Sequence, residues 1–278
     1  MSRNLTGVHL VVGGYPPASP AAHDMDFVRL RLLQELSGHE AMQGRHSTVA
    51  SDYRGIERWL PTADLLVTYV AGPVPTDSEH AELTRWLEAG GRWLALHGTS
   101  GGKAARVEHH GRPARMMVRQ PHHDTIGGFF LNHPPIQRFT VHVATSHPLT
   151  AGLPASFEAV DELYLVELCD PANTQVLLST RLDADPSPPG FGFAYEADTS
   201  ALDAAGTRAL GFVHHVGAGA VAYVALGHAH SPATNGQPFV HPSVTADGTT
   251  PTTFHGMWED ATFLQLVHNA IGWGLAER

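Results

Sequence analysis

The chain has 278 residues, of which 42% are hydrophobic and 16% charged, a composition typical of globular proteins that excludes a disordered chain or a coiled coil. Its 17 Lys and Arg residues against 27 Asp and Glu give a net charge of -10, which excludes the basic surface of a nucleic-acid-binding protein. The single cysteine excludes a disulfide framework and a cysteine-based zinc site.

The first residues lack the apolar run of a signal peptide, and no segment is apolar enough over enough residues to span a membrane. We therefore expect a cytoplasmic protein without a membrane partner. The length predicts one domain over residues 1–278, with insertions near 101–123 and 230–253.

Buried strands and amphipathic helices alternate in the first hundred residues, which favours a parallel sheet with right-handed crossovers. In chain order they are a strand at 8–12, a helix at 25–36 capped by Asp24, a strand at 64–70, a helix between Thr76 and Gly90, and a strand at 93–96.

The second half adds elements that pair in the antiparallel sense. They are strands at 139–143, 163–168 and 176–180, a hairpin of 209–214 with 220–226, and a C-terminal helix at 258–272. The stretch 101–123 is polar, basic and helix-poor and is predicted to be a long surface insertion. The stretches 183–192 and 230–253 are predicted to be loops. The fold class is therefore α/β, with a mostly parallel central sheet and antiparallel additions.

The chain contains 20 histidines, and three of them follow predicted strands. His23 comes after the first strand, His97 directly after the strand at 93–96, and His228 after the last strand. Ligands of α/β proteins bind beyond the carboxyl ends of the parallel strands, so we expect these imidazoles to meet there. A histidine bonded into a turn, with no chemistry, is the alternative for His97.

The segment Gly98–Gly102 matches the G-x-S-x-G pattern of a nucleophile elbow, with Ser100 as its serine. The order Ser100, then Asp161 or Glu162, then His228 is also that of an α/β-hydrolase triad. Against a serine hydrolase, residues 103–108 are too few and too polar for the buried helix that follows such an elbow.

Two adjacent carboxylates, Asp161 and Glu162, precede the predicted strand at 163–168. Adjacent strand residues face opposite sides, so only one carboxylate can point into a given pocket. That group could be a metal ligand, a general base or a partner that orients a histidine; a solvated strand start is the alternative. His133 precedes a proline, which holds its backbone extended.

Several blocks in one order resemble the ThuA-like, or trehalose-utilisation, family over about residues 8–273. The blocks are Gly14 with His23-Asp24, 86–97 (WLEAGGRWLALH), 127–134 (GGFFLNHP), 146–153 (SHPLTAGL), 161–164 (DELY) and 225–228 (ALGH). The resemblance implies a flavodoxin-like three-layer sandwich related to class I glutamine amidotransferases, and a role in the catabolism of trehalose or an oxidised disaccharide. That superfamily carries a nucleophilic cysteine where this chain has His97, so glutamine hydrolysis is disfavoured.

The leading hypothesis is an enzyme that acts on a sugar or keto-sugar through a histidine-rich pocket. The expected catalytic residues are His97 with Glu162 or Asp161. The expected ligands of a divalent zinc or manganese ion are His97, His133 and His228. The expected sugar contacts are His23, Asp24, Tyr15, Tyr164 and Ser100.

One alternative is a non-catalytic sugar-binding accessory protein, in which sugar rings stack on Trp86, Trp93, Tyr15 and Tyr164. The other alternative is the serine hydrolase. A small sugar is the expected partner in the first two hypotheses, and homo-oligomer formation is left open.

Overall fold

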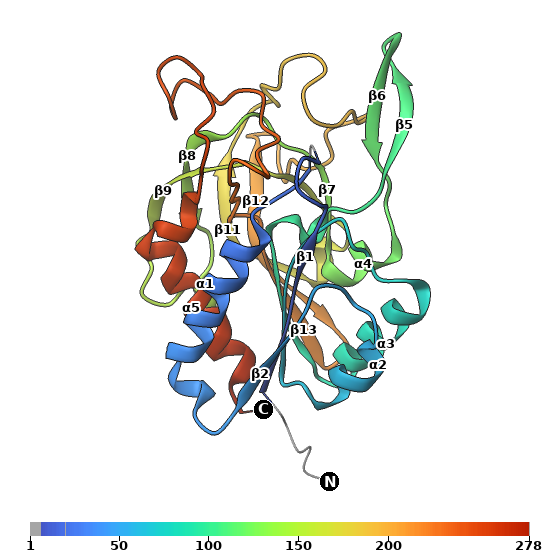
Figure 1. The fold of residues 1–278 in the computed structure, drawn as a ribbon, viewed down its shortest axis with the longest axis vertical. Helices are drawn as coiled ribbons and strands as arrows, with labels where there is room; N and C mark the ends of the chain where they lie inside the picture. The colour runs from blue at the N-terminus through green and yellow to red at the C-terminus, as the bar shows by residue number, and fades with distance from the viewer. Residues whose placement is uncertain (1–6, 20, 278) are drawn as a thin grey trace.

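The computed structural model describes residues 7–19 and 21–277, which fold around a nine-stranded sheet (Figure 1). In spatial order the strands are β2 (His46–Ala50), β1 (Gly7–Gly14), β3 (Leu65–Ala71), β4 (Arg92–Leu96), β13 (Gly219–Val224), β12 (Thr207–Val216), β11 (Thr174–Arg181), β8 (Gln137–Val143) and β9 (Ser156–Asp161).

The sheet is parallel in one half and antiparallel in the other. The run β2-β1-β3-β4-β13 is parallel throughout, and β12, β11, β8 and β9 extend it with antiparallel pairs. The parallel half has the strand order of flavodoxin-like proteins. The predicted α/β fold class, with a mostly parallel sheet and antiparallel additions, is confirmed.

Helices form the outer layers (Figure 1). Helices α1 (Met25–Gly38) and α5 (Ala261–Leu275) cover one face, and α2 (Ile56–Trp59), α3 (Asp77–Glu88) and α4 (Pro121–Ile126) lie on the other. Two small sheets accompany the large one, a pair of β7 (Gly128–Asn132) with β10 (Leu165–Leu168) and a hairpin of β5 (Ala104–His109) with β6 (Arg112–Met117). Short 3-10 helices lie at Glu40–Met42, Leu60–Thr62, His97–Ser100, Pro148–Thr150, Pro171–Asn173 and Gly256–Glu259.

Local sequence signals account for the helix starts. The Asp24 carboxylate accepts a hydrogen bond of 3.0 Å from the Phe27 backbone N–H and so caps α1. Thr76 and Glu79 form a capping box at the start of α3. Both helix starts, the hairpin β12–β13 and the C-terminal helix follow the sequence prediction.

The structure departs from the predicted elements at several points. The stretch 101–123, predicted to be a helix-poor surface insertion, contains the hairpin β5–β6 and the start of α4. The strand predicted at 163–168 begins only at Leu165, and the preceding strand β9 was not predicted. The edge strand β2 was also missed, because its side chains are exposed or half-buried and carry no apolar pattern.

No helix among the described residues combines the length and the apolar character that crossing a bilayer requires.

Two glycines give a matched test of the packing between α3 and the sheet. A Cβ on Gly219 would lie 2.2 Å from the Leu87 carbonyl oxygen and 2.4 Å from that of Gly91, whereas a Cβ on Gly38 would meet nothing within 4 Å. We expect Gly219→Ala to lower the free energy of unfolding by about 1–3 kcal/mol through overpacking. Gly38→Ala, at the end of α1, should leave it unchanged or raise it by up to about 1 kcal/mol. Denaturant unfolding measures both, and equal effects would contradict the packing described.

Candidate functional site

The carboxyl ends of the parallel strands open into a cavity of about 1550 Å³. Its floor includes His23, Glu162, Tyr164 and His228. Its walls come from the hairpin β5–β6 and from the segments 185–195 and 236–239, which belong to two long loops. The loops and the hairpin rise above this edge of the sheet in Figure 1.

His97 is held in an unusual backbone conformation directly below this floor. It follows β4, begins the 3-10 helix His97–Ser100, is fully buried, and has a φ of 46°. Only a few per cent of non-glycine residues adopt a positive φ, and such strain persists where the surroundings enforce it. At the next residue, Gly98, a Cβ would lie 2.7 Å from the Val70 carbonyl oxygen, so the turn passes close to the end of β3. The His97 ring is therefore fixed above the end of the strand.

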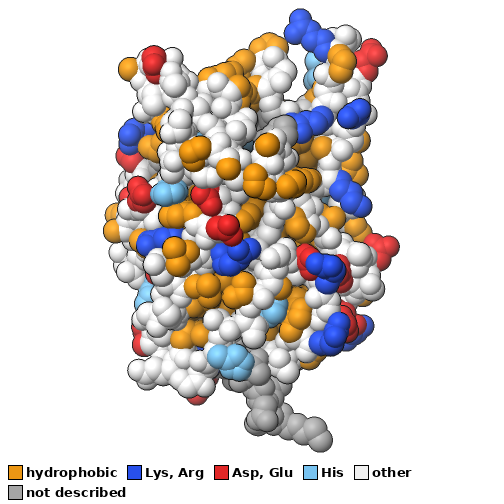
Figure 2. All heavy atoms as spheres, viewed as in Figure 1, with side chains coloured by type: hydrophobic (Ala, Val, Ile, Leu, Met, Phe, Trp, Pro, Cys, Tyr) orange, Lys and Arg blue, Asp and Glu red, His pale blue; other side chains and the backbone are white. Residues whose placement is uncertain are grey.

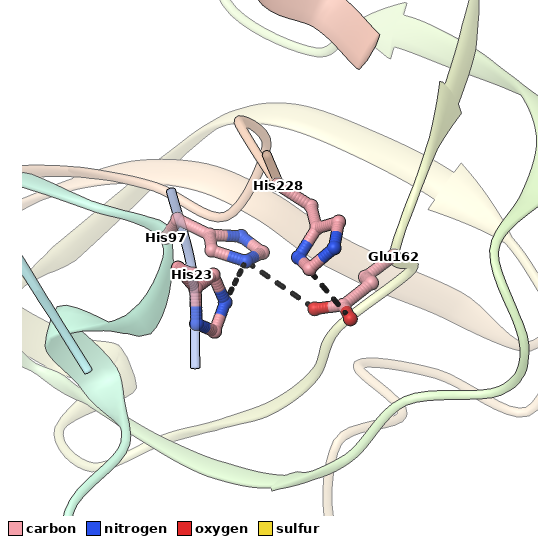
Figure 3. A group of neighbouring side chains, drawn as sticks. All are labelled: His23, His97, Glu162 and His228. Carbon is pink, nitrogen blue, oxygen red and sulfur yellow. Dashed lines mark hydrogen bonds and ion pairs between the residues drawn. The ribbon is translucent and has the colours of Figure 1, made fainter. Parts of the chain in front are cut away.

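Four side chains from distant parts of the chain meet at this point, and we call them the His–Glu cluster: His23, His97, Glu162 and His228 (Figure 3). Their ligand atoms all lie within 4.8 Å of one another, and all four residues are buried. The Nε2 atoms of His23 and His97 are 3.2 Å apart. Glu162 places Oε2 at 3.3 Å from Nε2 of His97 and Oε1 at 3.3 Å from Nδ1 of His228.

Backbone carbonyls determine the tautomers of two of these rings. Nδ1 of His97 donates to the Ala225 carbonyl at 2.7 Å, and Nδ1 of His23 donates to the Ala21 carbonyl at 3.1 Å. A neutral imidazole carries one N–H proton, so Nε2 of each ring is unprotonated and carries a lone pair. These two lone pairs are the ones that face each other.

A chain of hydrogen bonds determines the tautomer of His228. Nε2 of His230 donates to the Pro251 carbonyl at 2.8 Å, so Nδ1 of His230 accepts the proton of His228 Nε2 at 2.9 Å. Nδ1 of His228 therefore carries a lone pair, and this buried atom has no hydrogen-bond partner in the described structure. Three imidazole lone pairs and a carboxylate therefore converge, and the Tyr164 hydroxyl lies beside them as a donor, 3.0 Å from Nε2 of His97.

A positive charge at the centre of this arrangement, from a proton or a metal ion, would stabilise it. Burial lowers the pKa of His97, but the hydrogen bond and charge of Glu162 outweigh it, so this pKa is raised. Burial lowers the pKa of His228 to about 4 and that of His23 well below its usual value. Imidazoles kept neutral and aimed by a second hydrogen bond, together with a carboxylate, are the donors that divalent transition metals bind.

Of the two predicted carboxylates, only Glu162 faces the histidines. Asp161 Oδ2 accepts the backbone N–H of Gly227 at 2.7 Å, and its Oδ1 accepts that of His228 at 3.0 Å. Burial raises the pKa of Asp161 to about 7, against the opposing effects of His97 and these N–H groups. The expected catalytic role of Asp161 is thereby corrected, because its oxygens fix the turn that carries His228 and do not line the cavity.

The predicted metal ligand His133 lies outside the His–Glu cluster, and His23 stands in its place. Nε2 of His133 is 3.6 Å from Glu162 Oε1, and its Nδ1 donates to the Pro134 carbonyl at 2.8 Å. Tyr164, predicted to contact the sugar, is on the floor, with its hydroxyl 3.0 Å from Nε2 of His97. Burial raises the pKa of Tyr164, which keeps the hydroxyl protonated.

Of the other predicted sugar contacts, one lies on the rim of the cavity and two lie outside it. Tyr15 is on the cavity rim, 39% exposed. Asp24 caps α1 and does not line the cavity. Ser100 is fully buried, and its Oγ lies 2.7 Å from the Tyr223 hydroxyl. Asp24 and Ser100 are therefore not placed to contact a sugar.

Two polar residues of the cavity were missed in the sequence. Gln237 donates a short hydrogen bond to Glu162 Oε1. Asn132 donates to Asp185 at 2.9 Å and accepts from the Phe193 backbone N–H at 2.9 Å, which ties the loop wall to β7. Neither residue follows a strand of the large sheet. The search for side chains after predicted parallel strands, which identified the histidines, therefore could not identify these two residues.

Comparisons with known proteins agree with this architecture. A family model described as ThuA, trehalose utilisation, matches residues 22–241. A solved ThuA-like protein from Bacteroides uniformis superposes with a TM-score of 0.60 at 18% identity, covering 99% of this chain and 93% of that chain. One from Parabacteroides merdae has a TM-score of 0.58 at 14% identity, covering 98% and 90%. No curated protein matches the sequence.

The burial of Ser100 gives a direct test against the serine hydrolase. A reactive serine needs an adjacent base and access to the cavity, and Ser100 has a tyrosine hydroxyl instead. We expect a fluorophosphonate probe to label the folded protein no more than it labels Ser100→Ala. Labelling that disappears in Ser100→Ala would contradict the described position of Ser100.

Proposed function

Because the chain belongs to the ThuA, or trehalose-utilisation, family, we propose that it is an enzyme that acts on a sugar or keto-sugar at a divalent metal ion held by the His–Glu cluster. Family membership supports a role related to trehalose utilisation. The observation that carries the finer proposal is the convergence of three imidazole lone pairs and one carboxylate at the floor of a large cavity.

The residues of the cluster fit zinc or manganese. Both ions accept neutral imidazole and carboxylate ligands. Nδ1–H of His23 and of His97 is held by a carbonyl, and His228 is held by His230. Such outer hydrogen bonds fix ring orientation and raise ligand basicity. The ion would polarise a carbonyl oxygen of the substrate or activate a water molecule.

Two other residues are placed to handle protons beside that ion. The Tyr164 hydroxyl remains protonated and can donate to a substrate oxygen on the floor. His133 directs its Nδ1–H to the Pro134 carbonyl and lines the cavity with its other nitrogen available as an acceptor. His133 is therefore suited to remove a proton from a carbon beside a keto group.

Metal binding is tested by elemental analysis after loading with Zn²⁺ or Mn²⁺ and removal of excess ion. Wild type should retain about one equivalent, and Glu162→Gln or His228→Asn should bind about tenfold more weakly or worse, because each removes a ligand. His133→Asn is the matched control and should retain the metal, since His133 lies outside the cluster. Less than about a tenth of an equivalent in loaded wild type would contradict the metal site.

Catalysis is tested on the metal-loaded protein with trehalose and its keto derivatives, by product analysis. Tyr164→Phe and His133→Asn should lower kcat by about 10²-fold or more, as expected for loss of a general acid or base. Metal content should stay at the wild-type level in both variants. Sugar binding with no product from any of these substrates would contradict the enzyme and support the non-catalytic sugar-binding protein.

A further inference from the structure

Positive charge is concentrated on one element of this acidic protein. Residues 103–119 contain five of the 17 Lys and Arg residues of the chain and a single carboxylate, Glu108. Most of this segment is the hairpin β5–β6. Figure 2 shows Lys and Arg side chains gathered at the upper right, where Figure 1 places the hairpin.

The pairing of the hairpin brings like charges together. Arg106 lies directly opposite Arg115. Like charges in such cross-strand positions destabilise a pair of strands. Within residues 7–19 and 21–277, no carboxylate forms an ion pair with Arg106, Arg112 or Arg115. The fold alone does not explain why the hairpin keeps this destabilising pair of charges.

These three arginines, which we call the arginine wall, line the same cavity as the His–Glu cluster. The carboxylates that line this cavity do not neutralise them. Glu162 is engaged by the histidines and Gln237. Asp185 accepts hydrogen bonds from Asn132 and Tyr195, at 2.9 and 3.0 Å. The arginine wall is therefore free to bind an external anion.

Aromatic rings lie beside the arginine wall. The Arg115 guanidinium lies 4.9 Å from the centre of the Phe193 ring, and Phe191 and Phe239 also line the cavity, with their ring centres 5.4 Å apart. Apolar rings with a few placed polar groups are typical of small-molecule sites. The C–H faces of a sugar suit such rings, while a guanidinium suits a phosphate or carboxylate.

Building on the proposed function, we propose that the substrate is a sugar with an anionic substituent, and that the arginine wall binds this substituent while the sugar carbon that reacts lies over the His–Glu cluster. The shared chemistry is an oxyanion group, either a phosphate ester or a carboxylate. The aromatic side chains contact the sugar between the two ends.

The test is calorimetric titration of the metal-loaded protein with trehalose, trehalose 6-phosphate and the analogue of trehalose oxidised to a carboxylate at C6. We expect at least one anionic sugar to bind about tenfold or more tightly than trehalose, as for a charge-assisted contact. Comparison of the two anions identifies the preferred group. Arg106→Ala should remove about tenfold of that affinity and leave trehalose binding unchanged.

The matched control is Arg58→Ala, which removes the same charge from an arginine side chain that is 83% exposed and lies outside the cavity. It should leave all three affinities unchanged. Arg115→Lys, which keeps the charge but loses the two-pronged geometry, should give an intermediate loss for the anionic sugar.

Equal affinities for charged and neutral sugars would overturn the arginine wall as an anion site. So would an Arg106→Ala variant that binds the anionic sugar as tightly as wild type does. Metal retention and turnover of a neutral sugar would in that case leave the proposed function intact. Failure of all three sugars to bind would overturn the inference and the sugar site together, whereas loss of metal binding alone would overturn only the metal centre.

Discussion

The site depends on the convergence of three imidazoles and one carboxylate, all of them buried, at the floor of the cavity. The Nε2 atoms of His23 and His97 are 3.2 Å apart, and carbonyls elsewhere hold the proton of each ring. Two lone pairs at that separation repel each other unless a cation lies between them. Glu162 supplies the balancing negative charge. This convergence is the observation on which the proposed metal site rests, and the other residues of the cavity surround it.

The fold supplies the rigidity that this arrangement requires. The turn after β13 is fixed from three sides, because Asp161 binds its N–H groups and the Tyr69 hydroxyl and the Trp258 indole N–H donate to the Gly227 carbonyl at 2.9 and 2.7 Å. Buried polar groups that are fully hydrogen-bonded hold a single geometry. His228 thus projects from a fixed turn, as His97 does from the end of β4.

Chemistry and recognition are divided between different parts of the chain. The large sheet provides a buried, inflexible floor, and the hairpin β5–β6 and the long loops provide walls that are more exposed and rich in arginine and aromatic residues. Binding residues are commonly presented on loops by a rigid scaffold, because loops vary without disturbing the core. Relatives with the same floor could therefore differ in the substrates that their walls accept.

The sequence by itself determined the buried strands of the parallel half, the capped helices and the edge of the sheet where His23, His97 and His228 meet. These features follow from apolar periodicity and chain order, which are local properties. Only the tertiary structure selected Glu162 over Asp161, replaced His133 by His23 in the cluster, and buried Ser100 against Tyr223. It also placed the hairpin arginines in the wall of the cavity. The direction of each of these side chains is fixed by hydrogen bonds to segments far away in the chain. The apolar periodicity of a sequence carries no information about such distant partners.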